Sequence, residues 1–346
     1  MSANWVIEPS YKFDLASFSN FLSDDPIYAQ RHPDAYKLFL KRLPGVSQEV
    51  RQVAKELYNS GVLLGPGLAN FLSVDDYNGQ DIGRILACLD HPGLKAVPEY
   101  SPYLQFIPMV KSILSELHAM GLLEYWTKNC QPELTKKCAE LTSSASCYPV
   151  IDQVSAFLGE QYTVKATSIK LFLCHFSAPH GVSIFDSALL SDVRWPLETQ
   201  VPIVIHEMMH PPFAREAILK LTDLLSEDEF LLEAKQRLPK SSGYKELSSF
   251  VEENLVEAGH VYLAHQMGLI PDPLQYFVEH DHATHVLSAI VYNCLCAGWR
   301  TKATSYEGMV QRLVEEGIIA PGKLRDQYLE IYKLAGKEQH HPYLGK

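Results

Sequence analysis

The spacing of apolar residues predicts that most of this chain is helical. Apolar side chains recur every three or four positions over most of its length, which is the pattern of a helix with one buried face. From residue 1 to about 90 this pattern occurs in three segments, 14–24, 34–43 and 47–64. It predicts one long helix over 104–126, with Pro108 in its first turns, and a shorter helix over 133–147. After Pro202 the pattern is helical nearly to the end.

From about residue 161 to 190 the pattern is different. The segment QYTVKATSIKLFLCHF is rich in Thr, Val, Ile and Phe and alternates in part, which predicts strands. The predicted fold class is therefore α+β, predominantly α, with one small sheet. We expect two regions, an all-helical N-terminal region over 1–150 and a second domain over 151–346 that holds the strands. The N-terminal region is expected to be an accessory layer that packs on the second domain or restricts access to it.

Composition excludes several classes of protein. The chain has 346 residues and a net charge of -11, from 41 acidic and 30 basic residues, without a dense Lys/Arg stretch. We expect neither nucleic acid nor an anionic membrane as a partner, because both favour clustered positive charge. No apolar run approaches the roughly 18–20 residues of a membrane span. The start lacks the features of a signal peptide, and the seven cysteines form no CxxC. These features predict a cytoplasmic location.

One motif in the chain has the form that binds a catalytic metal. His206-Glu207-Met208-Met209-His210 is H-E-x-x-H. Histidines at positions i and i+4 lie one turn apart on one face of a helix, so both imidazoles can reach one ion. Glu207 points toward the same open side and can accept a proton from a water on that ion. The apolar run 201–205 precedes the motif, as a buried active-site helix requires.

A third ligand is expected on a helical segment downstream, because a catalytic zinc takes three protein ligands and leaves one position open. The segment SSFVEENLVEAGHVYLAHQMG, 248–268, carries several candidates. Glu253 and Glu257 are one turn apart and share a face, whereas Glu252 is offset by about 100° from Glu253. The spacing alone leaves five residues of this segment open as the third ligand: Glu252, Glu253, Glu257, His260 and His265.

The H-E-x-x-H motif followed by a helix bearing E-N-L-V-E-A resembles the gluzincin branch of zinc metallopeptidases, the thermolysin-like clan. The resemblance covers about 160–265. It implies a zincin-like domain that holds one zinc ion per chain on His206, His210 and Glu253, with Glu257 orienting His206. Glu257, and after it Glu252 or His260, are the alternatives to Glu253 as the ligand. It also implies that an extended peptide binds along an edge strand, expected within 167–176. Pro211 and Pro212 depart from the family pattern and predict that the motif helix ends or kinks there.

The resemblance further implies a donor that stabilises the oxyanion. The segment EHDHATH, 279–285, is the favoured source, because Asp281 can cap a helix and place His282 in its first turn. Other candidates for this donor lie in the same part of the chain: His280, His285, Tyr262 and Tyr276.

The predicted function is hydrolysis of peptide bonds in a peptide or protein substrate, by a zinc-activated water with Glu207 as general base. One alternative is a zincin-fold protein that hydrolyses another amide, or that binds a ligand with a retained zinc site. Another is a helical interaction scaffold without metal, in which the motif is accidental. The presence of Glu207 favours chemistry over binding, but it does not single out peptide bonds.

Overall fold

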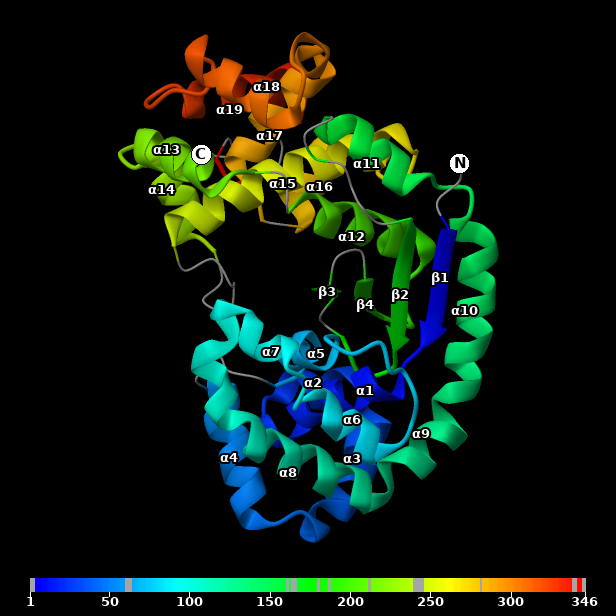
Figure 1. Ribbon diagram of the computed structural model, residues 1–346. Coiled ribbons are helices and arrows are strands. Elements are labelled where there is room, and N and C mark those ends of the chain that lie inside the picture. Colours follow the sequence, from blue (N-terminus) through cyan, green and yellow to red (C-terminus); the bar gives the residue numbers. More distant parts are fainter. Residues whose placement is uncertain are drawn as a thin grey trace. The chain divides into compact units, whose positions relative to one another are not determined.

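The computed structural model describes residues 4–59, 64–159, 162, 167–178, 181–185, 188–210, 213–238, 246–280, 282–337 and 341–343. In these ranges the protein is predominantly helical with one small mixed sheet (Figure 1). The predicted fold class, α+β and mostly α, is confirmed. The chain forms two compact units. We call them the sheet unit, 4–147 with 166–197, and the helical unit, 1–3 with 148–165 and 198–346.

The sheet unit contains all four strands of the described chain and most of the shorter helices. The strands are β1 (Asn4–Pro9), β2 (Ser168–Cys174), β3 (Val182–Phe185) and β4 (Ala188–Asp192). The α-helices are α1 (Tyr11–Phe18), α2 (Pro26–Arg31), α3 (Pro33–Arg42), α4 (Gln48–Asn59), α5 (Pro66–Leu72), α6 (Ile82–Cys88), α7 (Gly93–Ala96), α8 (Ile107–Leu117), α9 (Leu123–Asn129) and α10 (Gln131–Ala145). Tighter or wider turns form η1 (Ser19–Ser23), η2 (Leu43–Gly45), η3 (Pro98–Phe106) and η4 (His118–Leu122).

The sheet has the order β1-β2-β4-β3. Strand β1 and strand β4 are both parallel to β2, and β3 is antiparallel to β4. The apolar register places Leu171 of β2 opposite Leu189 of β4, and both are buried. Helix α10 packs along β1 (Figure 1). Because β2 is paired on both sides, the prediction of an edge strand within 167–176 is wrong. The edges of this sheet are β1 and β3.

The observed division of the chain differs from the predicted one. The boundary near residue 150 is present, but the strands 168–192 group with the N-terminal helices and not with the residues after 198. The N-terminal region is also not all-helical, because Asn4–Pro9 forms β1 and pairs with β2. Pairing between segments more than 160 residues apart leaves no mark in the local apolar pattern, which explains the error.

Asp14 holds several elements of the sheet unit together. It lies in the first turn of α1, whose N-cap is Ser10, and its side chain is fully buried. Its Oδ2 accepts a hydrogen bond from Trp126 Nε1 at 2.6 Å. Its Oδ1 accepts from the backbone N–H groups of His175 at 2.7 Å and Phe176 at 2.8 Å. Burial raises the pKa of this carboxyl to about 7, although the three donors act in the opposite direction.

The run Tyr100–Asn129 is long and apolar enough to cross a membrane by length and composition alone, which differs from the sequence expectation. Core helices of soluble proteins meet the same criterion. This run changes course at Gly121, where φ is 89°. It also carries the charged residues Lys111, Glu116, Glu124 and Lys128, and it buries Val110, Ile113, Leu114, Leu117, Leu122 and Trp126. Only 28% of its apolar window is buried. One run of this kind among the described residues is weak evidence for a membrane span, and it is consistent with a soluble protein.

The helical unit is built around α15. Its helices are α11 (Val150–Leu158), α12 (Leu197–Met209, all but Leu197 in this unit), α13 (Arg215–Leu225), α14 (Glu229–Gln236), α15 (Leu247–Gln266), α16 (Pro273–His280), α17 (Val286–Cys296), η6 (Trp299–Lys302), α18 (Tyr306–Glu315) and α19 (Leu324–Leu334). Thirteen of the twenty residues of α15 are buried. A helix that is buried almost all round lies in a core, so the polar residues on α15 need partners.

Two contacts set the position of α15. The Asn254 side-chain oxygen accepts from the backbone N–H groups of Leu287 at 3.0 Å and Ser288 at 3.3 Å, which lie in the first turn of α17. Gly259 gives α12 a close approach, because a Cβ there would lie 2.4 Å from the Met209 side chain. The first contact fixes the rotation of α15, and the second brings it next to the helix that carries the motif.

Candidate metal centre

Helix α12 carries the H-E-x-x-H motif, as predicted. Its apolar residues Val201, Val204, Ile205, Met208 and Met209 are buried, and His206, Glu207 and His210 lie on the partly exposed side. The rings of His206 and His210 lie 5.0 Å apart between centroids. The helix begins at Leu197, so Pro202 lies inside it and not in its first turn. It ends at Met209, as the prolines predicted, although 211 and 212 themselves lie outside the described residues.

Glu253 of α15 meets both motif histidines. Its Oε1 lies 3.2 Å from His206 Nε2, and its Oε2 lies 3.8 Å from His210 Nε2. One ligand atom from each of these three residues lies within 4.8 Å of the other two. Neighbouring ligands around a tetrahedral zinc, with bonds of about 2.0–2.1 Å, are about 3.3 Å apart. The donor types and the separations therefore both fit a zinc ion.

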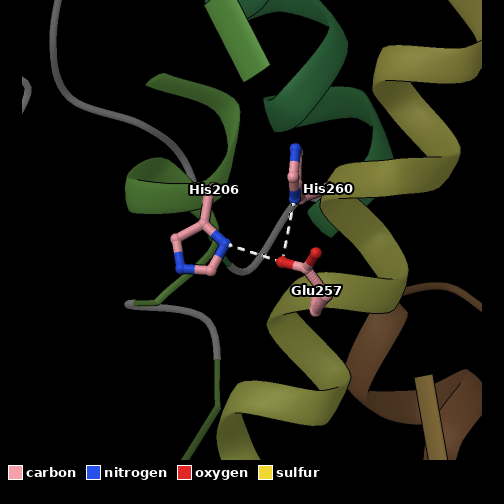
Figure 2. A group of neighbouring side chains, drawn as sticks. All are labelled: His206, Glu257 and His260. Carbon is pink, nitrogen blue, oxygen red and sulfur yellow. Dashed lines mark hydrogen bonds and ion pairs between the residues drawn. The ribbon is translucent and has the colours of Figure 1, made fainter. Parts of the chain in front are cut away.

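Glu257 lies on the other side of the His206 ring. One of its oxygens, Oε2, lies 3.1 Å from His206 Nδ1 and 3.1 Å from His260 Nδ1. Figure 2 shows this oxygen between the two imidazoles, with His206 on α12 and the other two residues on α15. His206 therefore presents Nδ1 to Glu257 and Nε2 to Glu253. A carboxylate bonded to the far nitrogen of a ligating histidine fixes the orientation and the tautomer of that histidine.

The same residues allow a second grouping. His206, Glu257 and His260 also bring one ligand atom each within 4.8 Å of the others. The two groupings share the His206 ring but use opposite sides of it. His260 and Glu257 are 3% and 5% exposed, whereas the side chains of His206 and His210 are 18% and 38% exposed. A catalytic metal needs an accessible position for water, so the grouping with His210 and Glu253 is the better candidate.

The charges of this cluster are strongly coupled. Burial lowers the pKa of His206, but its hydrogen bonds to Glu253 and Glu257 outweigh burial and raise that pKa well above its usual value. Burial raises the pKa of Glu257, but the charges and hydrogen bonds of His260 and His206 outweigh it and hold that pKa well below its usual range. Burial and the neighbouring His206 lower the pKa of His210. The cluster therefore keeps Glu257 as an acceptor for both imidazoles.

The prediction for His282 is wrong in its local structure. His282 is exposed, in a turn with φ of 52°, and α17 begins only at Val286. Asp281, its expected cap, lies outside the described residues. Of the other candidates, Tyr276 on α16 contacts the cluster, because its ring lies 5.9 Å from that of His260, and it also stacks on the His280 ring at 4.0 Å. The role of an oxyanion donor stays a prediction for all of them.

Sequence reasoning gave His260 little weight, as one of the last alternatives for a ligand. In the structure it is buried and bonded to Glu257. A signal for it was present, because 253, 257 and 260 follow the i, i+4, i+7 spacing of one helix face. Glu252, another alternative, lies outside both groupings of the described residues.

The chain was compared with protein-family models, with curated proteins and with solved structures, and none of these comparisons found a match.

Proposed function

We propose that this protein is a cytoplasmic zinc metallopeptidase of the gluzincin type, with one zinc ion per chain held by His206, His210 and Glu253. The observation that carries the proposal is that one carboxylate from α15 lies within 4 Å of both histidines of H-E-x-x-H. Two neutral imidazoles and a carboxylate are the ligand set of the thermolysin-type catalytic zinc. The carboxylate of Glu257 on His206 Nδ1 further supports it.

The protein residues then have separate tasks. Bound zinc would polarise a carbonyl oxygen and lower the pKa of a coordinated water. Glu207 accepts the proton of the attacking water and passes it to the nitrogen of the leaving amine. It is suited to this task because it is next to His206 in sequence and is only partly buried. A donor from the region 276–285 is expected to stabilise the oxyanion, with His282 and Tyr276 as candidates.

Elemental analysis of the full chain, purified without chelators, tests the metal centre. We expect about one zinc per chain in the wild type and in Glu207→Gln, and little in Glu253→Ala. Glu252→Ala is the matched control, because it removes the neighbouring carboxylate from the same helix, and it should keep the zinc. A wild type without zinc, or a Glu253→Ala variant with full zinc, would contradict the proposal.

Cleavage of a peptide library, followed by mass spectrometry, tests the reaction. The wild type should produce new peptide termini, and the zinc-loaded Glu207→Gln variant should not. A zinc-loaded wild type that cuts no peptide but hydrolyses other amides would support the alternative zincin-fold hydrolase. Zinc binding without any hydrolysis would support the binding protein.

A further inference from the structure

We infer that His260 is a positioning residue of this centre, which holds the Glu257 carboxylate in place and thereby sets how His206 faces the metal. The inference rests on the proposed zinc centre. It concerns a residue that lies one contact farther from the metal than Glu257 and that is not a ligand in the proposed set.

The geometry of the shared oxygen carries this inference. Glu257 Oε2 accepts from Nδ1 of both His206 and His260, at 3.1 Å each (Figure 2). A glutamate side chain has three rotatable bonds, so a single hydrogen bond leaves its carboxylate several orientations. His260 lies three residues later on the same helix and adds a second, local restraint. It also packs its ring at 81° to the His206 ring, with the centroids 5.4 Å apart.

The tautomers follow from these contacts. An ionised carboxylate only accepts, so the nitrogens that face it carry their hydrogens. Both nitrogens of His206 face carboxylates, Nδ1 that of Glu257 and Nε2 that of Glu253. A bound metal would take the Nε2 side, and the hydrogen bond to Glu257 would keep the remaining hydrogen on Nδ1. Without His260, the Glu257 carboxylate can turn away and the His206 ring loses this preference. His260 therefore influences the metal site through two successive hydrogen bonds, from His260 to Glu257 and from Glu257 to His206.

The opposite side of His260 argues against a purely structural role. Its Nε2 is buried and has no hydrogen-bond partner among the described residues. A buried polar atom without a partner destabilises a folded protein. An apolar ring of similar size at this position would avoid that penalty, but it would also remove one of the two donors to the buried Glu257 carboxylate. The contact with Glu257 is therefore what a histidine provides here.

The test is the zinc affinity of the full chain, measured by competition with a chromophoric chelator. We expect His260→Phe, which keeps a ring but cannot donate, to bind zinc roughly tenfold more weakly. His260→Asn should restore the affinity to within about twofold, because its amide nitrogen occupies the place of Nδ1. His260→Gln should not restore it, because its amide lies one bond farther from the helix. Thermal unfolding of the metal-free variants checks that each of them is folded.

The matched control is His265→Phe, the same substitution on the same helix. His265 bonds to the backbone oxygen of Ile270 and not to Glu257, so its variant should bind zinc like the wild type. Equal affinities of the wild type and folded His260→Phe would overturn this inference and leave the zinc centre standing. A wild type that binds no zinc would overturn the centre and the inference with it. Complete loss of zinc in His260→Phe, with zinc retained in Glu253→Ala, would make His260 a ligand and overturn both.

Discussion

Replacing Asp14 by Asn should change how the stability of the sheet unit depends on pH. The Asp14 carboxyl is fully buried near the buried carboxylate of Asp192, and burial raises its pKa to about 7. Its three hydrogen-bond donors favour the ionised form and act against burial. The sign of the pH dependence therefore shows which of the two effects is larger. An asparagine cannot ionise, so it removes the titration.

The magnitude follows from the shift. An unfolded chain ionises this carboxyl near its ordinary value of 3.8, and the folded chain does so near 7. Between these values the unfolded state binds fewer protons, so stability falls as the pH rises. Roughly three units at about 1.4 kcal/mol each give about 4 kcal/mol. This contribution is fully present below pH 4 and is lost by about pH 8. Replacing the carboxyl by an amide also changes stability by an amount that does not depend on pH. This amount shifts the difference between wild type and variant equally at every pH, so it does not affect the trend.

Urea unfolding between pH 4.5 and 8, followed by tryptophan fluorescence, measures this difference, and Trp126 lies directly on the carboxyl. The free energy of unfolding of the wild type, minus that of Asp14→Asn, should fall across this range by most of the 4 kcal/mol. Asp34→Asn, which removes an exposed carboxyl on α3, should show no such trend. A difference that stays constant, or that rises with pH, would mean that the three donors outweigh burial.

Three further substitutions or treatments test the helical unit. Gly259→Ala should destabilise the protein by about 1 kcal/mol in urea unfolding. The added Cβ would lie 2.4 Å from the flexible end of Met209 and 3.1 Å from the more rigid Phe157 ring. Crowding against both, at about 1–3 kcal/mol, outweighs a gain in helix propensity of about 1 kcal/mol, and a more stable variant would contradict the close approach. Glu257→Leu should weaken zinc binding by about 10–100-fold in calorimetry. Glu257→Gln should weaken it less, because its amide oxygen still accepts the hydrogen bond from His206. Equal losses in both variants would show that the charge of Glu257, and not its orientation of His206, matters. Free zinc at about 100 times its Kd should stabilise the wild type by about 2.7 kcal/mol in thermal unfolding, and chelation should reverse this; an equal effect on Glu253→Ala would place the metal elsewhere.

The candidate site was largely predictable because its spacing is local. His206 and His210 are related by one turn of a helix, and so are Glu253 and Glu257, and the structure contains both helices. That the two pairs face each other is a property of the tertiary structure. Only the resemblance to gluzincins implied it, and the metal itself stays a prediction. His260 was given little weight, although its spacing from Glu253 and Glu257 places all three on one helix face.

The sheet was less predictable because its pairing is not local. Strand β1 has six residues, between a terminus and a buried helix, and its partner β2 begins at Ser168. The apolar pattern of so short a segment does not separate a strand from a helix. The same limit applies to His282, whose positive φ depends on how the chain turns between α16 and α17. Neither the pairing of β1 with β2 nor the conformation of His282 can be derived from the neighbouring residues in the sequence.

Charge balance links the buried residues of α15 to the proposed metal. Glu253 and Glu257 are each only 5% exposed, and burying an uncompensated carboxylate is strongly unfavourable. In the structure His206 lies against both carboxylates, and His260 lies against that of Glu257. A divalent cation held by neutral imidazoles compensates both. A helix with a purely structural role would gain more from apolar residues at these two positions. A divalent cation at this face would therefore stabilise the pair of carboxylates, and this charge balance supports the proposed metal centre.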